Sequence, residues 1–222
     1  MGTIERTKND DVGYIENFFD QNMIDWCLWY FSQFDNQRFN GRKYIQETHW
    51  NLPFNQWFGD YCKKQVKKVY PEALIHSIYI GNDVKTGGIH TDGWLYEGEK
   101  ELFYKTILIP LKFNVPSSTI IFNERESKGR TLNQITGLGN DGIETMEQFQ
   151  ELDKHKIFPK EIHDKYLKHL DYSGLHGLSV HGIMEWHPGR ALTWDRERWH
   201  GPVCFEGNNI ERYHVTIMTH KK

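Results

Sequence analysis

The chain has 222 residues, of which 38% are hydrophobic and 14% aromatic, enough for one domain with a buried core and too much for a disordered chain. Its net charge of −3 gives no electrostatic case for nucleic acid or an anionic membrane as a partner. No apolar run approaches the roughly 20 residues that cross a bilayer, and the first residues do not resemble a secretion signal. Three scattered cysteines, Cys27, Cys62 and Cys204, favour reduced thiols and a cytoplasmic location.

Residues 1–73 predict a helical part that packs on a sheet. Asp20 can cap a first helix, because apolar residues follow it at nearly helical spacing. A second helix fits Asn55–Val69, with its apolar residues on one side. The residues that mark the two helices are Met23, Cys27, Tyr30 and Phe34 in the first, and Phe58, Tyr61, Cys62 and Val69 in the second.

From Leu74 the sequence changes to short β-rich segments that are separated by glycine and proline. Pro188-Gly189 suits the central positions of a type II turn, which predicts that the strands on either side form a hairpin. Many short strands without alternating helices favour an antiparallel sandwich or barrel. The predicted strands are 74–80, 88–92, 106–113, 119–122, 178–186, 190–194 and 213–219.

Residues 123–177 interrupt the β pattern and predict an inserted helical segment. A capping box at Thr145 starts one helix, which we expect to run to Lys156, and Pro159 starts another. Long excursions inside compact domains are usually lids or binding loops, so we expect the insertion to cover the mouth of a site. A surface decoration is the alternative.

Two HxD tripeptides are candidate metal-binding motifs, and local structure separates them. His169-Leu170-Asp171 lies in a predicted helix, where residues two apart point in nearly opposite directions and cannot bind one ion. His90-Thr91-Asp92 lies at the end of a β segment, where residues two apart share a face. Two histidines and one carboxylate on one face of an octahedron favour Fe(II) and oxygen chemistry.

The second histidine must come from elsewhere in the chain, and His200 ends a β segment just past the predicted hairpin. Twelve residues later, Arg212 opens the last predicted strand. An arginine can hold a carboxylate through two parallel hydrogen bonds, as a dicarboxylate cosubstrate requires.

This order of HxD, distant histidine and basic residue resembles the 2-oxoglutarate/iron dioxygenases. Residues 106–122 are similar to the strand pair that follows HxD in that family, and residues 188–194 to the strand before the distal histidine. The resemblance covers residues 74–122 and 178–219. It implies a double-stranded β-helix, a cupin-like jelly roll that is mainly β with flanking helices, and one oxygenase domain over 1–222.

The resemblance also implies an activity. His90, Asp92 and His200 match the ligands of Fe(II), and Arg212 matches the residue that pairs with the far carboxylate of 2-oxoglutarate. The expected reaction hydroxylates an unknown small-molecule or protein substrate with O2 and converts 2-oxoglutarate to succinate and CO2. This chain has His214 where some members have a serine, so the resemblance does not specify the contacts to the cosubstrate beyond Arg212.

Tyr79 and Thr106 are further candidates for binding the cosubstrate through their hydroxyl groups, with core packing as the alternative.

Two other functions of the protein remain open. Glu97 follows Asp92 by five residues, as a fourth ligand of a cupin-like metalloenzyme without 2-oxoglutarate would. A catalytically silent jelly-roll binding module is the third possibility.

Overall fold

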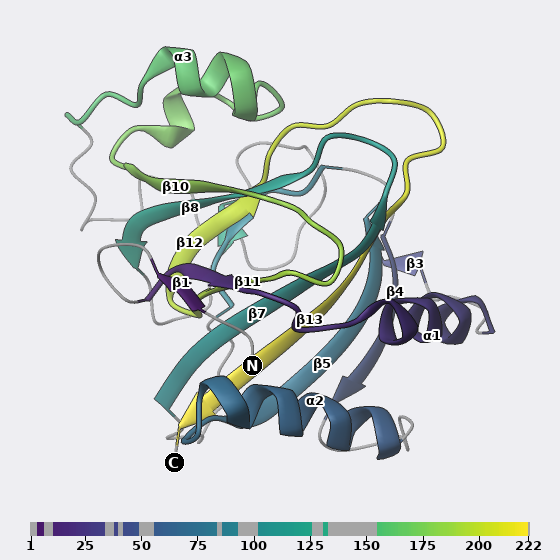
Figure 1. The fold of residues 1–222 in the computed structure, drawn as a ribbon. Coiled ribbons are helices and arrows are strands. Elements are labelled where there is room, and N and C mark those ends of the chain that lie inside the picture. The colour runs from purple at the N-terminus through teal and green to yellow at the C-terminus, as the bar shows by residue number, and fades with distance from the viewer. Residues whose placement is uncertain are drawn as a thin grey trace.

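A computed structural model describes residues 4–6, 11–33, 38–39, 42–48, 56–83, 86–92, 102–125, 131–132 and 155–221. Antiparallel strands make up most of the regular secondary structure of these residues, and a few helices flank them (Figure 1). None of the helices in the described ranges is both long and apolar enough to cross a membrane. The helices and helical turns are α1 (Gln21–Ser32), α2 (Gln56–Val69), α3 (Lys160–Ile162), a π-helical turn η2 (His163–Leu167) and a 3-10 turn η3 (Ser173–Leu175).

Two sheets stack as a sandwich. The large sheet has eight strands in the order β1-β2-β11-β7-β13-β5-β4-β3, and the small sheet has five in the order β10-β8-β12-β6-β9. The strands are β1 (Ile4–Arg6), β2 (Gly13–Ile15), β3 (Arg38–Phe39), β4 (Arg42–Thr48), β5 (Leu74–Asp83), β6 (Ile89–His90), β7 (Leu102–Phe113), β8 (Ser118–Arg125), β9 (Thr131–Leu132), β10 (Val180–Glu185), β11 (Ala191–Asp195), β12 (Arg198–Pro202) and β13 (Arg212–Lys221).

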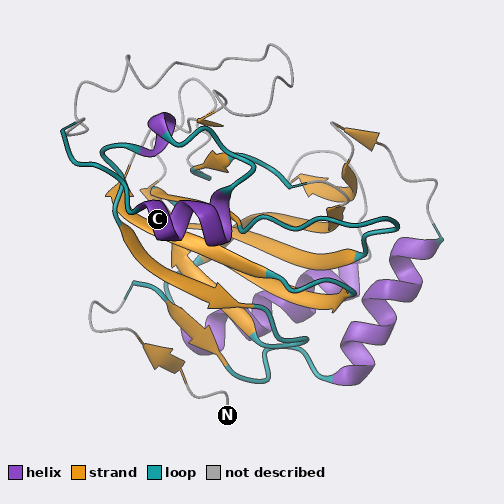
Figure 2. Ribbon diagram, turned by 90° about the horizontal axis from the view of Figure 1, so that it is seen from above, coloured by secondary structure: helices purple, strands orange, loops and turns teal. Residues whose placement is uncertain are grey.

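From β5 onward the chain crosses between the two sheets in jelly-roll fashion, except that β8, β9 and β10 follow one another in the small sheet. The strands β5, β7, β11 and β13 belong to the large sheet, whereas β6, β8, β10 and β12 belong to the small sheet. The expected fold, a mainly β jelly roll with flanking helices, is therefore confirmed. Figure 2 shows the stacked strands from above, with α1 and α2 beside them.

The two long helices cover the outer face of the large sheet (Figure 1). The Asp20 side chain accepts a hydrogen bond from the Met23 amide (2.9 Å) and caps α1, as the sequence predicts. Because Met23, Cys27, Phe58 and Cys62 are buried in one cluster with the isoleucines of β5, β7 and β13, the amphipathic pattern is confirmed. Phe34 and Asn55 lie outside the described residues.

The helical part expected over 1–73 also contains strands that the sequence did not predict. The strand β2 pairs with β11, and β4 pairs with β5 and extends the large sheet toward its edge. The sequence of β4, Arg-Lys-Tyr-Ile-Gln-Glu-Thr, is mostly polar and gives no apolar alternation. Strands near a sheet edge carry charged residues that prevent further pairing, so the strand signal is weak there.

The predicted hairpin around Pro188-Gly189 is also wrong. The turn itself forms, as the positive φ of Gly189 (+76°) shows. Only glycine fits at this position, since a Cβ there would lie 2.4 Å from the Phe19 carbonyl oxygen. However, β10 pairs with β8 in the small sheet, whereas β11 pairs with β7 in the large sheet. The turn therefore connects the two sheets.

The described part of the insertion packs on the outer face of the small sheet. The strand β8 continues to Arg125, past the predicted start of the insertion, and β9 lies within it. Pro159 precedes α3 and η2, as expected, and the buried side chains of this part join those of β8 and β12 in a second cluster. That cluster is Ile89, Ile120, Phe122, Phe158, Leu167, Leu170, Leu175, Leu178, Trp199 and Val203. The predicted helix from Thr145 lies almost wholly outside the described residues, and a lid over the site stays a prediction.

This packing predicts that Leu167 contributes to stability. Leu167 is 0% exposed, so Leu167→Ala should lower the free energy of unfolding by about 2–5 kcal/mol in urea denaturation. The matched control is Ile157→Ala in the same segment, because Ile157 is 71% exposed and should change stability by less than about 0.5 kcal/mol. Equal effects of the two variants would contradict this packing.

Candidate metal centre

The two histidines of the candidate site face each other across adjacent strands. His90 of β6 is the direct partner of His200 of β12. Because Ile89 and Trp199 point into the outer cluster, the alternation of side chains directs both histidines toward the space between the sheets. Gly201 allows the strands to approach closely, since a Cβ there would lie 3.2 Å from the Gly88 carbonyl oxygen.

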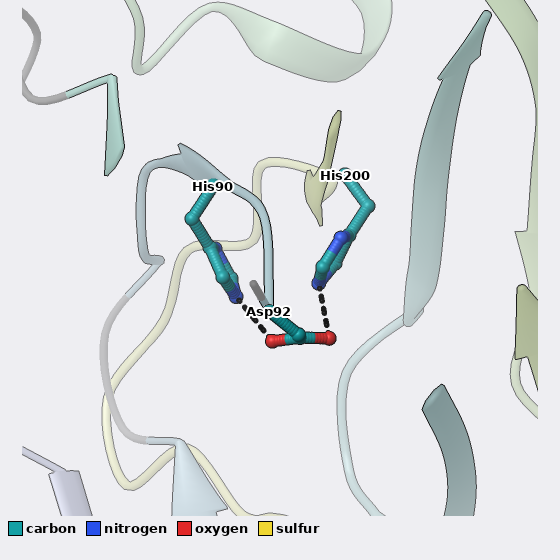
Figure 3. Close-up of side chains that lie close together, drawn as sticks. All are labelled: His90, Asp92 and His200. Carbon is teal, nitrogen blue, oxygen red and sulfur yellow. Dashed lines mark ion pairs between the residues drawn. The ribbon is translucent and has the colours of Figure 1, made fainter. Parts of the chain in front are cut away.

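Asp92 completes the cluster from the segment after β6 (Figure 3). The distance from Asp92 Oδ1 to His90 Nε2 is 3.7 Å, and that from Asp92 Oδ2 to His200 Nε2 is 3.4 Å. One ligand atom from each residue lies within 4.8 Å of the others. With metal–ligand bonds of about 2.1 Å, two ligands of one ion lie at most about 4.2 Å apart, and both ion-pair distances are inside that limit.

The hydrogen bonds of the imidazole rings direct the unprotonated nitrogens of the neutral histidines toward the centre. His90 Nδ1 lies 3.2 Å from the Gly88 carbonyl oxygen, and His200 Nδ1 lies 3.0 Å from the Arg198 carbonyl oxygen. A carbonyl oxygen only accepts, so each Nδ1 donates and each neutral ring keeps its lone pair on Nε2. Two lone pairs and a carboxylate then converge, which fits a divalent metal with open coordination positions.

The Asp92 carboxylate is held in its ionised form. Burial alone would raise its pKa, but the positive charges of His200 and His90 in their protonated form and a hydrogen bond from Thr106 outweigh burial and lower it. Thr106 Oγ1 donates to Asp92 Oδ2 at 2.6 Å. Asp92 therefore offers a charged ligand at neutral pH.

Arg212 lies on the inner face of β13 and is 0% exposed. Its guanidinium carbon lies 4.1 Å from the ring centres of both Trp186 and Phe205, and its Nε donates to Ser117 Oγ at 3.0 Å. Asp83 Oδ2 is 3.8 Å from Nη1. Rings on both faces of a guanidinium leave its N–H groups directed sideways, which suits a planar carboxylate.

Arg212 is linked by contacts between the two sheets to the strand that carries His200. The first contact is with Trp186. Trp186 belongs to the cluster between the sheets, and its indole N–H donates to Thr119 Oγ1 on β8 at 2.9 Å. Thr119 stands opposite Pro202, two residues after His200 on β12. The inner face of the sandwich thus carries both predicted binding groups.

Tyr79 and Thr106, the other candidates for the cosubstrate, also lie on the inner face of the large sheet. The Tyr79 hydroxyl is 3.9 Å from Met218 Sδ, and Met218 pairs with Thr106 in the sheet. The Thr106 hydroxyl is directed at Asp92, which indicates that it orients a metal ligand. A contact of Tyr79 with a cosubstrate stays a prediction.

The second HxD tripeptide serves another purpose. His169 Nε2 lies 3.2 Å from the Gly87 carbonyl oxygen, and burial lowers the pKa of His169 to about 4. Asp171 instead accepts hydrogen bonds from Ser173 and Gly174. The two side chains do not share a site, as predicted, but the prediction that this tripeptide lies in a helix is wrong, because η2 ends at Leu167 and the tripeptide lies in the turn that follows.

Sequence reasoning missed two residues next to the cluster. The Trp194 ring lies 4.7 Å from the His200 ring, and Arg196 donates hydrogen bonds to the backbone of Asp92. The signal was their position just before His200, but Trp194 ends a predicted strand and Arg196 stands among charged residues, so neither was singled out. Glu97, the possible fourth ligand, lies outside the described residues.

The hydrogen bond from Thr106 gives a testable prediction. Thr106→Val keeps the shape of the side chain but removes the donor, so the affinity for Mn(II) should fall about 10-fold in a calorimetric titration. Thr106→Ser keeps the donor and should stay close to the unaltered protein. If valine and serine bind Mn(II) equally well, the hydroxyl does not orient Asp92.

Comparisons with known structures agree with the fold. The non-heme alpha-ketoglutarate-dependent carbocyclase SnoK from nogalamycin biosynthesis aligns with a TM-score of 0.57 and 9% identity, over 99% of this chain and 87% of that one. A 2OG-Fe(II) oxygenase family oxidoreductase from Burkholderia pseudomallei aligns with a TM-score of 0.53 and 9% identity, over 97% and 86%. HygX from Streptomyces hygroscopicus, solved with nickel and 2-oxoglutarate, gives 0.53 and 12%, over 96% and 83%.

No model of a known family matches the sequence, and no curated protein matches it either. The similarity to the solved structures is thus one of fold. The chain has the jelly-roll fold of these oxygenases.

Proposed function

We propose that this protein is an oxygenase that uses Fe(II), O2 and 2-oxoglutarate to hydroxylate a small-molecule or protein substrate. The observation that carries the proposal is the convergence of His90, Asp92 and His200 between the sheets of a jelly roll. Bound there, Fe(II) would supply the activation of O2 that is coupled to decarboxylation of 2-oxoglutarate to succinate and CO2. The fold shared with 2-oxoglutarate oxygenases supports the same function.

Different residues of this chain would bind the metal and the cosubstrate. His90, Asp92 and His200 would hold the metal on one side and leave its other positions for cosubstrate and O2. Arg212 would hold the far carboxylate of 2-oxoglutarate, because it is a buried cation with a fixed orientation. A buried guanidinium gives stronger hydrogen bonds to a carboxylate than an exposed one.

The alternatives lack this support. A cupin-like metalloenzyme without 2-oxoglutarate would give Arg212 no ligand to bind. A silent binding module would have no use for two histidines whose Nδ1 atoms are both fixed by backbone carbonyls. We keep a cytoplasmic location as part of the proposal, since Cys27, Cys62 and Cys204 are all free thiols.

Titration of 2-oxoglutarate into Mn(II)-loaded protein tests the proposal. We expect the protein to bind Mn(II), and the metal-loaded protein to bind 2-oxoglutarate. With Fe(II) and O2, it should release succinate slowly without substrate and faster with a substrate from a panel of candidates. Mn(II) binding without 2-oxoglutarate binding would favour the cupin-like enzyme, and no binding of either would favour the silent module.

A further inference from the structure

Arg196 is a buried arginine in the turn between β11 and β12, and it lies next to the metal cluster without belonging to it. Its side chain is 1% exposed. Nε and Nη2 donate to the backbone carbonyl oxygen of Asp92, at 3.1 and 2.7 Å, and Nη1 donates to that of Thr219 at 3.1 Å. Burying a charge is costly unless it is well hydrogen-bonded, so these contacts are the reason this arginine is stable in the interior.

The contact between Arg196 and Asp92 is reciprocal. The Asp92 amide donates to the backbone oxygen of Arg196 at 3.0 Å, so three hydrogen bonds join the two residues. Arg196 stands four residues before His200, in the turn that leads from β11 into β12. The turn just before one candidate ligand, His200, therefore holds the backbone of another, Asp92.

The hydrogen bond from Arg196 Nη1 to the Thr219 carbonyl oxygen ties this pair to the large sheet. Thr219 lies in β13, and its hydroxyl exchanges hydrogen bonds with the backbone of Lys105 in β7 (both 2.9 Å). Thr106, the next residue of β7, donates to the Asp92 carboxylate. Arg196 thus sets the backbone of Asp92 relative to the same strands that orient its side chain.

We propose that Arg196 is a positioning residue that fixes the spacing between Asp92 and His200 and so presets the metal site. This inference rests on the proposed function, because it assumes that the cluster binds a metal. His90 and Asp92 share one segment, whereas His200 comes from another part of the chain. The Arg196 side chain joins these two parts directly, through a planar fork whose orientation a lysine cannot reproduce.

Two variants test this role. Arg196→Lys keeps the positive charge and most of the side-chain length but loses the fork, and Arg196→Gln keeps an amide donor without the charge. We expect Arg196→Lys to bind Mn(II) about 10- to 100-fold more weakly than the unaltered protein, the range for groups that orient metal ligands. The visible spectrum of the Co(II)-loaded variant should also change, because ligand geometry sets it.

Arg198→Lys is the matched control. Arg198 is a buried arginine at the start of β12, just after the same turn, but its side chain donates to Asp11 Oδ2 and to the Phe122 carbonyl oxygen (both 2.8 Å). The same substitution there should lower the free energy of unfolding of the metal-free protein to a similar extent. Because only the side chain changes, the Arg198 carbonyl oxygen that accepts from His200 Nδ1 stays in place. The Mn(II) affinity should therefore stay within about 3-fold, since affinities this close differ by less than 1 kcal/mol.

Arg196 is a purely structural residue if Arg196→Lys and Arg198→Lys lower stability equally and both bind Mn(II) like the unaltered protein. If Arg196→Lys does not fold, Arg196→Gln decides on the same two measurements, with Arg198→Gln as its control. Failure of the proposed function would look different. The unaltered protein would then bind no Mn(II), and the inference on Arg196 would fall with it.

Discussion

Asp92→Asn should weaken the binding of Mn(II) or Fe(II) by more than about 100-fold, beyond the range for groups that only orient ligands. The substitution hardly changes the shape of the side chain, but it removes the only negative charge among the three ligands. Thr106 can still donate to the remaining carbonyl oxygen, so the fold should persist. Metal binding is measured by calorimetry with Mn(II), and succinate release with Fe(II) and 2-oxoglutarate should be lost in parallel.

The chain offers a matched control for this variant in its second HxD tripeptide. Asp171 accepts hydrogen bonds from Ser173 and from the Gly174 amide, in a segment on the outer face of the small sheet. Asp171→Asn should therefore bind the metal as the unaltered protein does. Mn(II) affinity that survives Asp92→Asn, or that falls equally in Asp171→Asn, would refute the assignment of the site.

The metal cluster was predictable because its geometry follows from local rules. Residues two apart in a strand share a face, and this rule selects His90 and Asp92 over His169 and Asp171, although in the structure Asp92 follows β6 and the second tripeptide lies in the turn after η2. The order of the chain then selects His200. The sequence could not predict that His200 would stand directly opposite His90, because strand register depends on the whole sandwich.

The predictions that failed also depend on contacts between parts of the chain that are distant in sequence. Pro188-Gly189 forms the turn that its residues favour, but local chemistry does not decide which strands pair beyond it. The jelly roll places β10 and β11 in different sheets. Arg196 was missed because Asp195, Glu197 and Arg198 surround it, a composition typical of an exposed turn. Its burial arises from contacts with Asp92 and Thr219, which are distant in sequence.

The second large effect concerns Arg212. Arg212→Ala should weaken the binding of 2-oxoglutarate to the Mn(II)-loaded protein by about 1.5–3 kcal/mol, the range for hydrogen bonds to charged groups. The metal affinity should hardly change, since Arg212 is not one of the three ligands. Because alanine leaves a space between Trp186 and Phe205, Arg212→Lys is the second variant. Lysine fills that space but loses the bidentate geometry.

Arg190→Lys is the control for Arg212, because Arg190 is also an arginine that packs on an aromatic ring, but on a different strand neighbour, Tyr14. Its guanidinium carbon lies 3.8 Å from the centre of the Tyr14 ring, and it pairs with Glu16. We expect no change in 2-oxoglutarate affinity there. Unaltered cosubstrate affinity in both Arg212 variants would refute the role of Arg212.

The charges around Arg212 also predict a variant that binds 2-oxoglutarate more tightly. The Asp83 carboxylate lies 3.8 Å from Arg212 Nη1 and 3.9 Å from His214 Nδ1, so it neutralises part of the positive charge that a cosubstrate carboxylate would meet. Asp83→Asn keeps the shape and removes that charge, and it should tighten 2-oxoglutarate binding by a few-fold at low ionic strength. Added salt should reduce the gain, because it screens the part of the interaction that reaches solvent. Weaker binding in Asp83→Asn would mean that Asp83 supports the orientation of Arg212 more than it competes for its charge.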